Sequence, residues 1–302
     1  MDHKVSSACA EDRTSLRHTL KDGRQLSYAK YGQQDGYPII FLHGSPGSRI
    51  AVEEEIYSHL GVEIIYPERP GYGYSSPNPK ASFKSWADDI VSLLDHWGIE
   101  QIDIAGASAG GAYTLACIAF YPHRFRSATL IGSAAPPQTP NYRKGMFLGN
   151  RLAIWLSRYA PFLIRAASGN FARKFKKYPD QVWQQVSKQL CEADQTILTE
   201  AKKKGTYPVF VDHLMEAFRN GTEGHVADIR NIARPWAIPF TAIQCPVYLW
   251  HGIDDTLSPI AGAKAMAAWL PTARAEFLPN AGHLLADDEV ILEKILSQIL
   301  NV

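Results

Sequence analysis

The sequence predicts an α/β fold, a mostly parallel sheet with helices on both faces. Two observations support this: short apolar runs bounded by Gly or Pro recur along the chain, and segments with helical periodicity lie between them. Near-continuous apolar runs are typical of strands covered on both faces, as in a parallel sheet. The predicted strands are residues 25–32, 38–44, 62–68, 101–107, 128–134, 246–252 and 275–281.

Three segments between or after these strands show the signals of amphipathic helices. Residues 82–98 place their apolar side chains on one helical face and end at Gly98, a residue that favours helix termination. Residues 110–122 stop at a proline, and residues 289–300 repeat apolar side chains at helical spacing. Helices that alternate with buried strands indicate a sheet wound on both sides.

Residues 138–240 interrupt this alternation. The segment is helix-like and aromatic, and its 16 Lys and Arg against 8 Asp and Glu give a balance of +8. The remaining chain carries 15 and 22, a balance of −7, so the two parts sum to the formal net charge of +1. We expect a basic helical insertion at 138–240 and a mildly acidic sheet domain formed by residues 1–137 and 241–302.

Composition excludes several classes of protein. A net charge of +1 gives no reason to expect a nucleic-acid partner. The four cysteines are scattered without a CxxC pair, and no His/Cys cluster has metal-ligand spacing, so we expect no metal and no other cofactor. Residues 1–15 lack the apolar stretch of a secretory signal, and no apolar run is long enough to span a bilayer. We expect a cytoplasmic protein.

The stretch IDIAGASAGGAY, residues 102–113, places Ser108 between a predicted strand and a predicted helix. Glycine in regular structure costs about 0.5–1 kcal/mol relative to alanine, so the small residues around Ser108 need a local reason. A sharp strand-to-helix turn of the type G-x-S-x-G supplies one, because the backbone doubles back without room for larger side chains. Such a turn exposes the serine hydroxyl at the carboxyl end of the sheet. The alternative is a structural turn whose serine caps the helix.

Two later loops carry an acid and a base. Residues 251–259, HGIDDTLSP, follow one predicted strand, and residues 279–285, PNAGHLL, follow another. A serine hydroxyl needs a base that accepts its proton and an acid that orients the base. Both loops lie at the strand ends where Ser108 is expected, so His283 is the candidate base and Asp255 or Asp254 the candidate acid.

These motifs resemble those of α/β-hydrolase-fold serine hydrolases, from about residue 25 to the C-terminus. The HG-x-P loop, the G-x-S-x-G turn, the G-x-x-D loop and the late GH match that family in identity and order. The resemblance implies an α/β-hydrolase fold and favours Asp255, three residues after a glycine, over Asp254. It further implies that the backbone N–H groups of Ser45 and Ala109 bind the oxyanion.

The resemblance also gives residues 138–240 a role. They lie where the family places a helical cap, or lid, inserted after the sixth strand, which covers the serine and forms much of the substrate pocket. Met146, Trp155 and Phe162 are the candidates for lining a pocket that accepts an apolar acyl or aromatic group. The alternative is that these side chains only dock the insertion on the core.

Together these features predict a cofactor-independent serine hydrolase that acts on a small-molecule carbonyl substrate through an acyl-enzyme, with a carboxylic ester preferred over a thioester, lactone or amide. The triad would be Ser108, Asp255 and His283. The same residues could serve a lyase, a perhydrolase or a C–C hydrolase, and the fold is also compatible with a slow-turnover receptor for a small molecule or a pseudoenzyme that acts through protein contacts.

Overall fold

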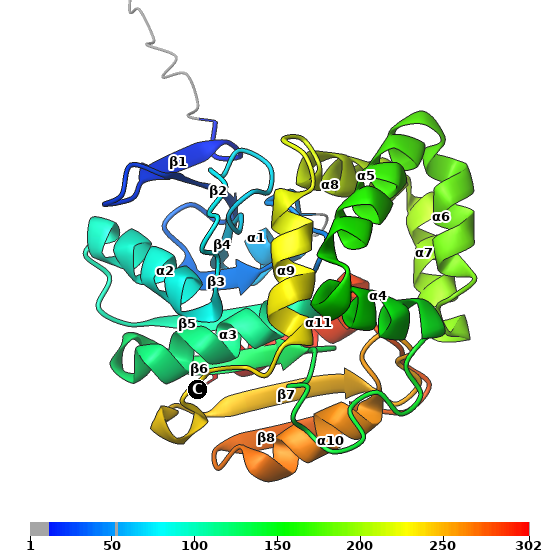
Figure 1. Ribbon diagram of the computed structural model, residues 1–302. Helices are drawn as coiled ribbons and strands as arrows, with labels where there is room; N and C mark the ends of the chain where they lie inside the picture. The colour runs from blue at the N-terminus through cyan, green and yellow to red at the C-terminus, as the bar shows by residue number, and fades with distance from the viewer. Residues whose placement is uncertain (1–11, 52–53, 302) are drawn as a thin grey trace, which may run out of the picture.

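A computed structural model describes residues 12–51 and 54–301, whose strands form one sheet in the order β1-β2-β4-β3-β5-β6-β7-β8 (Figure 1). β1 and β2 pair antiparallel, as do β2 and β4, and the pairs from β4 through β8 are parallel. This confirms the predicted mostly parallel sheet. The strands are β1 (Leu16–Thr19), β2 (Gln25–Gly32), β3 (Tyr37–Leu42), β4 (Val62–Pro67), β5 (Ile102–Ala107), β6 (Phe125–Ile131), β7 (Val247–Gly252) and β8 (Ala273–Leu278).

Each predicted strand has a counterpart in this sheet. The apolar runs of β4 and β7 are buried at every position, as expected for strands covered on both faces. The sequence did not predict β1, a four-residue edge strand that carries little apolar sequence. β8 ends at Leu278 rather than residue 281, and the residues that follow it form the loop to His283. Residues 1–11 lie outside the described residues, and with them one of the four cysteines, Cys9, and most of the segment expected to lack a secretory signal.

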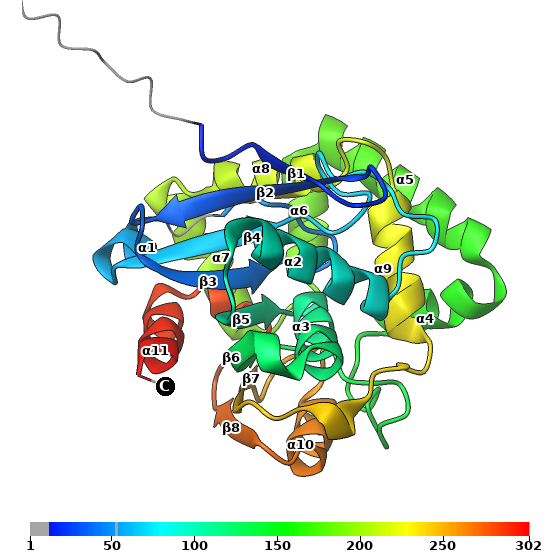
Figure 2. The ribbon, with the colours of Figure 1, turned by 90° about the vertical axis from the view of Figure 1, so that its left-hand side faces the viewer.

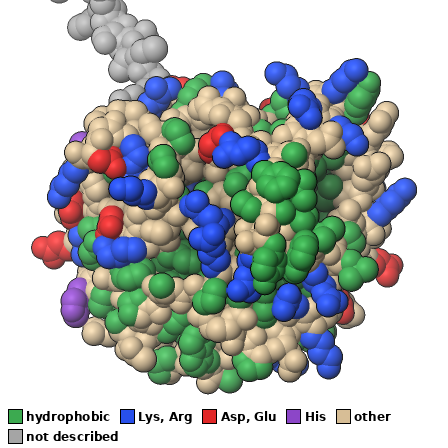
Figure 3. Space-filling model, viewed as in Figure 1, with side chains coloured by type: hydrophobic (Ala, Val, Ile, Leu, Met, Phe, Trp, Pro, Cys, Tyr) green, Lys and Arg blue, Asp and Glu red, His purple; other side chains and the backbone are tan. Residues whose placement is uncertain are grey.

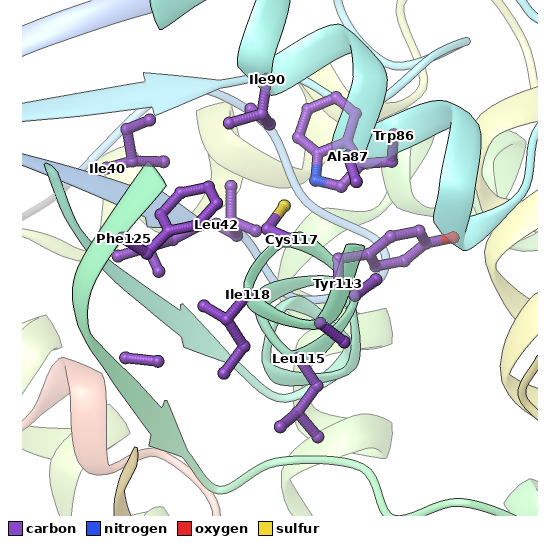
Figure 4. Close-up of a cluster of buried hydrophobic side chains, with 14 of the residues drawn as sticks. Ile40, Leu42, Trp86, Ala87, Ile90, Tyr113, Leu115, Cys117, Ile118 and Phe125 are labelled. Carbon is purple, nitrogen blue, oxygen red and sulfur yellow. The ribbon is translucent and has the colours of Figure 1, made fainter. Parts of the chain in front are cut away.

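Helices cover both faces of the sheet (Figure 2). One face carries α2 (Phe83–Trp97), α3 (Ala109–Phe120) and α10 (Ile260–Trp269), and the other carries α1 (Glu54–His59) and α11 (Glu289–Leu300). Each face has its own cluster of buried side chains. In the cluster of the first face, Trp86 and Ile90 of α2 lie near Ile118 of α3 and Leu42 of β3 (Figure 4).

The sequence marks the ends of α2 clearly. Ser82 and Ser85 form a reciprocal capping box at its N-terminus. Gly98 ends the helix at φ 67°, in the left-handed region where glycine has no steric penalty. These end signals explain why the bounds of this helix were predicted to within a residue.

Between β6 and β7 the chain forms a continuous series of helices, within the residues predicted to be helical. They are α4 (Leu148–Tyr159), α5 (Pro161–Lys177), α6 (Pro179–Ser187), α7 (Glu192–Lys204), α8 (Tyr207–Ala217) and α9 (Glu223–Ala233). We call residues 148–233 the helical segment. Short 3-10 turns occur at η1 (Pro122–Arg124), η2 (Phe240–Ala242) and η3 (Leu285–Asp287). Within the described residues, every helix is too short or too polar to cross a bilayer.

Candidate active site

Ser108 occupies the sharp turn between β5 and α3. Its φ of 53° and ψ of −120° lie in a strained region for a residue with a side chain. Its backbone N–H donates to the carbonyl of Ile131 at the end of β6, 2.8 Å away, so the neighbouring strand fixes the turn. The Ser108 side chain makes no capping hydrogen bond to α3. Ser108 therefore occupies a strained turn and does not act as a helix cap.

Close backbone approach explains the glycines on either side of Ser108. A Cβ on Gly106 would lie 2.5 Å from the Gly110 carbonyl oxygen, and a Cβ on Gly110 would lie 2.1 Å from the Leu42 carbonyl oxygen. Neither approach tolerates a side chain, because the obstructing atoms are backbone. The G-x-S-x-G pattern is therefore required for α3 to start against β3.

Asp255 and His283 come together at the ends of β7 and β8. The Nδ1–H of His283 donates to Asp255 Oδ2 at 2.7 Å, which leaves Nε2 free to accept a proton. Asp255 Oδ1 accepts the backbone N–H groups of Leu257 and Ser258, each at 2.8 Å. Asp255 is buried and Asp254 is exposed, so the structure selects Asp255 of the two adjacent acids as the partner of His283.

The serine turn and the His–Asp pair meet at residues 131–132. Ser108 bonds to Ile131, and a Cβ on the next residue, Gly132, would lie 3.5 Å from His283 Nδ1 and 3.7 Å from Asp255 Oδ2. Ser108 and His283 also line the same cavity. The three predicted triad residues are thus gathered at one edge of the sheet.

Electrostatics favour a charged pair. Burial disfavours the protonated form of His283, but the Asp255 carboxylate, with smaller contributions from Asp194 and Asp287, raises the pKa of the imidazole above its ordinary value. Burial would raise the pKa of Asp255, but His283 and the backbone donors together lower it below its ordinary value. An ionised Asp255 beside a basic His283 can hold a proton taken from a hydroxyl.

A carboxylate from the helical segment holds the His283 loop, and this role was not predicted from the sequence. Asp194, in the first turn of α7, accepts the backbone N–H of His283 through Oδ2 and that of Leu284 through Oδ1, both at 2.9 Å. Its side chain is fully buried, and its negative charge helps to raise the pKa of His283. Asp194 lies 89 residues before His283, and no local pattern connects the two positions.

A second buried network holds the loop that contains Ser45. The Arg69 guanidinium donates to the carbonyls of His43 and Gly44, both at 2.6 Å, and pairs with Asp228 of α9 at 2.8 Å. Asp228 also accepts the hydroxyl of Tyr72, which lies 3.0 Å from Ser45 Oγ. The helical segment therefore supports this loop as well as the His283 loop.

The backbone N–H of Arg69 donates to His43 Nε2, and His43 Nδ1–H donates to the Gly44 carbonyl at 2.7 Å. Burial lowers the pKa of His43 well below its ordinary value, so this imidazole is neutral. His43 belongs to the framework of the loop.

A cavity of about 590 Å³ lies over Ser108, between the sheet and the helical segment. Ser45, Ala109 and His283 line it, and most of its other lining side chains are apolar or aromatic. Of the three predicted pocket residues, only Met146 lines the cavity. The prediction for Trp155 and Phe162 is wrong: they are 54% and 70% exposed, and neither lines the cavity. Trp155 lies on the face of α4 opposite the cavity wall, and Phe162 lies on the surface at the start of α5.

Among the described residues, no cluster of three or more His, Cys, Asp or Glu side chains could hold a metal ion. His283 and Asp255 hydrogen-bond to each other, and Asp255 also accepts two backbone N–H groups. The donor set at this site is that of a proton-transfer pair.

The fold and the site together define the class of hydrolytic α/β enzymes. The features that define it are a parallel sheet covered on both faces, a serine on a strained strand-to-helix turn, and a buried His–Asp pair beside one cavity. Residues 37–290 match the family model of the alpha/beta hydrolase fold, and the chain belongs to that family as a hydrolase of this fold.

The chain is similar to several proteins over most of its length. An uncharacterized hydrolase, YcgS, of Bacillus subtilis is 28% identical over 277 residues, 87% of this chain and 90% of the relative. A 2-hydroxymuconate semialdehyde hydrolase of Pseudomonas putida is 25% identical over 280 residues, 86% and 87% of the two chains. The solved structure of a thermophilic esterase from Thermogutta terrifontis superposes with a TM-score of 0.65 at 22% identity, covering 95% and 98% of the two chains.

Proposed function

We propose that this protein is a serine hydrolase that cleaves a carboxylic ester through an acyl-enzyme. The observation that carries the proposal is the convergence of Ser108 and the His283–Asp255 pair on one mostly apolar cavity. Ser108 Oγ attacks the substrate carbonyl, and His283 Nε2 takes the hydroxyl proton and later passes it to the leaving alcohol. Asp255 keeps the Nδ1–H tautomer and stabilises the imidazolium. Water then hydrolyses the acyl-enzyme by the same proton transfers.

The oxyanion of the tetrahedral intermediate is bound by the backbone N–H groups of Ser45 and Ala109. Both residues line the cavity beside Ser108, and Ala109 is the first residue of α3, so its N–H points out of a helix N-terminus. A Cβ on Gly44 would lie 3.5 Å from Ser108 Cβ, which shows how closely the Ser45 loop approaches the serine. Removal of one such donor typically costs about 100- to 1000-fold in rate.

The helical segment and its connections, residues 138–240, act as a cap that roofs the cavity and selects the substrate. Met146, Phe171 and Phe175 supply apolar lining from this part of the chain, which suits an apolar acyl or aromatic group. Asp194 and Asp228 anchor the cap to the two loops of the site, so the cap remains docked on the core while substrate enters.

Active-site labelling tests the proposal. A fluorophosphonate should modify Ser108 in the folded protein, as located by peptide mass spectrometry, and the label should be lost in His283→Ala and after denaturation. Short p-nitrophenyl esters should be hydrolysed, and Ser108→Ala should lower kcat by about four orders of magnitude or more. An unlabelled Ser108 in folded protein would rule out the serine mechanism. Tight, saturable binding without turnover would instead identify a receptor.

Hydrolysis of an activated C–C bond is a second candidate, because the Pseudomonas putida relative is named as a hydrolase of 2-hydroxymuconate semialdehyde, a compound without an ester or amide bond. The same serine and base would serve both reactions. A panel that contains esters, lactones, amides and a vinylogous 1,5-diketone separates them. A kcat/KM for the diketone far above that of every ester would assign the C–C reaction.

A further inference from the structure

The outer face of α4 is apolar and exposed. Leu148, Leu152, Trp155 and Tyr159 are spaced by four, three and four residues, so they form one stripe along the helix. Their side chains are between 54% and 72% exposed, and the rings of Trp155 and Tyr159 lie 5.3 Å apart. Phe162 and Leu163 extend the apolar surface to the start of α5. We call these six residues the α4–α5 patch.

Exposed large apolar side chains are concentrated at the α4–α5 patch. Among the described residues, ten large apolar side chains are exposed, and six of them belong to the α4–α5 patch. In Figure 3 apolar side chains gather over the region of α4, with Lys and Arg side chains beside them. Exposed apolar side chains that cluster in this way mark a surface that meets a partner.

The charges around the patch have one sign. Residues 141–177 contain nine Lys and Arg and no acid, and no Asp or Glu occurs anywhere between Asp103 and Asp180. Arg151 and Arg158 are exposed three positions after Leu148 and Trp155, so they border the stripe. Arg165 of α5 pairs with Glu223 of α9, so the charge of this acid is neutralised.

We propose that the α4–α5 patch docks this protein on a negatively charged lipid surface. An exposed stripe of Leu, Trp and Phe bordered by arginines is the pattern of a helix that lies in the headgroup region of a bilayer. The apolar side chains insert, and the arginines meet the anionic headgroups. A second copy of this chain fits the patch less well, because two identical basic faces would repel each other.

The docking surface is also the outside of the cavity wall. Asn150, Ala153 and Ile154, on the inner face of α4, line the cavity whose outer side carries the patch. The width of α4 therefore separates the proposed lipid contact from the cavity over Ser108.

Flotation with vesicles tests this proposal without reference to catalysis. The full-length protein is mixed with vesicles of phosphatidylcholine alone, or of phosphatidylcholine and phosphatidylglycerol in equal parts. We expect association with the anionic vesicles, weaker association with the neutral ones, and loss at high salt. Arg151→Gln/Arg158→Gln should lower the partition coefficient by about fivefold for each arginine, about 25-fold in all. The triple variant Leu152→Ser/Trp155→Ser/Phe162→Ser should lower the partition coefficient by at least ~10-fold.

Exposed residues elsewhere provide matched controls. Lys21→Gln/Lys80→Gln removes two charges from the sheet domain, and Trp269→Ser/Val290→Ser removes two exposed apolar side chains outside the patch. Both should bind vesicles as the wild type does, and circular dichroism should show all variants folded. The proposal is overturned if the wild type does not bind anionic vesicles at low salt, or if the patch variants bind them with the same partition coefficient as the wild type. It is also overturned if sedimentation shows a dimer that the apolar variant disperses, without vesicle binding.

Discussion

Asp194→Asn separates two effects of Asp194 on His283, namely its hydrogen bonds to the backbone of the His283 loop and the effect of its charge on the pKa of His283. The wild-type carboxylate accepts two buried backbone N–H groups, those of His283 and Leu284, and its charge raises the pKa of His283. The asparagine variant keeps one acceptor oxygen, turns its NH₂ toward the other N–H, and has no charge. One lost bond to a charged acceptor and one buried, unsatisfied N–H should lower the free energy of unfolding by about 2–4 kcal/mol.

The charge effect appears in the pH profile. His283 must be neutral to accept a proton, so kcat/KM falls as pH drops below the pKa of the free enzyme's imidazole. Asp194 raises that pKa, and the variant should therefore lose activity at a lower pH than the wild type does. The assays are hydrolysis of a soluble ester from acid to neutral pH and urea denaturation at neutral pH.

Asp212→Asn is the matched control, since Asp212 is an exposed acid on the neighbouring helix α8 and should change neither measurement. Reduced stability with an unmoved acid limb would show that Asp194 acts on the backbone alone. An unchanged stability and an unchanged profile would refute the claim that the helical segment positions His283.

Three further predictions follow from the buried acids. Asp255→Asn should lower kcat for a p-nitrophenyl ester by about 10⁴-fold, because it changes the tautomer of His283. Asp254→Asn should change kcat by less than ~3-fold. Equal effects of the two substitutions would refute the assignment of Asp255 as the acid. Asp228→Ala leaves the buried Arg69 guanidinium unpaired and should cost about 3–5 kcal/mol in urea denaturation, and a loss under ~1 kcal/mol would contradict that role. Burial raises the pKa of Asp287 to about 7 against an ordinary 3.8, so the folded wild type loses stability as pH rises toward and through that value. Asp287→Asn, judged by urea titrations at about pH 5 and 8, should therefore gain about 2–3 kcal/mol over wild type between the two pH values, and a constant difference would refute the raised pKa.

The parts of the site that lie at strand ends could be predicted, because parallel strands place their carboxyl ends at one edge. Ser108, Asp255 and His283 each follow an apolar run within a few residues, and the structure brings them to that edge. The residues alone left Asp255 and Asp254 open, and the family resemblance favoured Asp255. The conformation of the loop, in which Asp255 Oδ1 accepts two backbone N–H groups, gives the physical reason for that choice.

The supporting residues could not be predicted. Asp194 and Asp228 belong to helices α7 and α9, whose sequences show only ordinary polar patterns. What makes them important is the packing of the helical segment on the core, where each meets loops that are far away in the chain. A buried carboxylate and an exposed one have the same sequence signature.

By itself the sequence determined the alternation of strands and helices, the strained turn at Ser108 and the positions of its partners, since each depends on residues close together in the chain. Only the tertiary structure decided which face of α4 covers the cavity, and this orientation left Trp155 exposed on the outer face. It likewise left Phe162, at the start of α5, on the surface. An apolar stripe records that a helix has an apolar side, but what that side meets depends on surfaces brought together from distant parts of the chain.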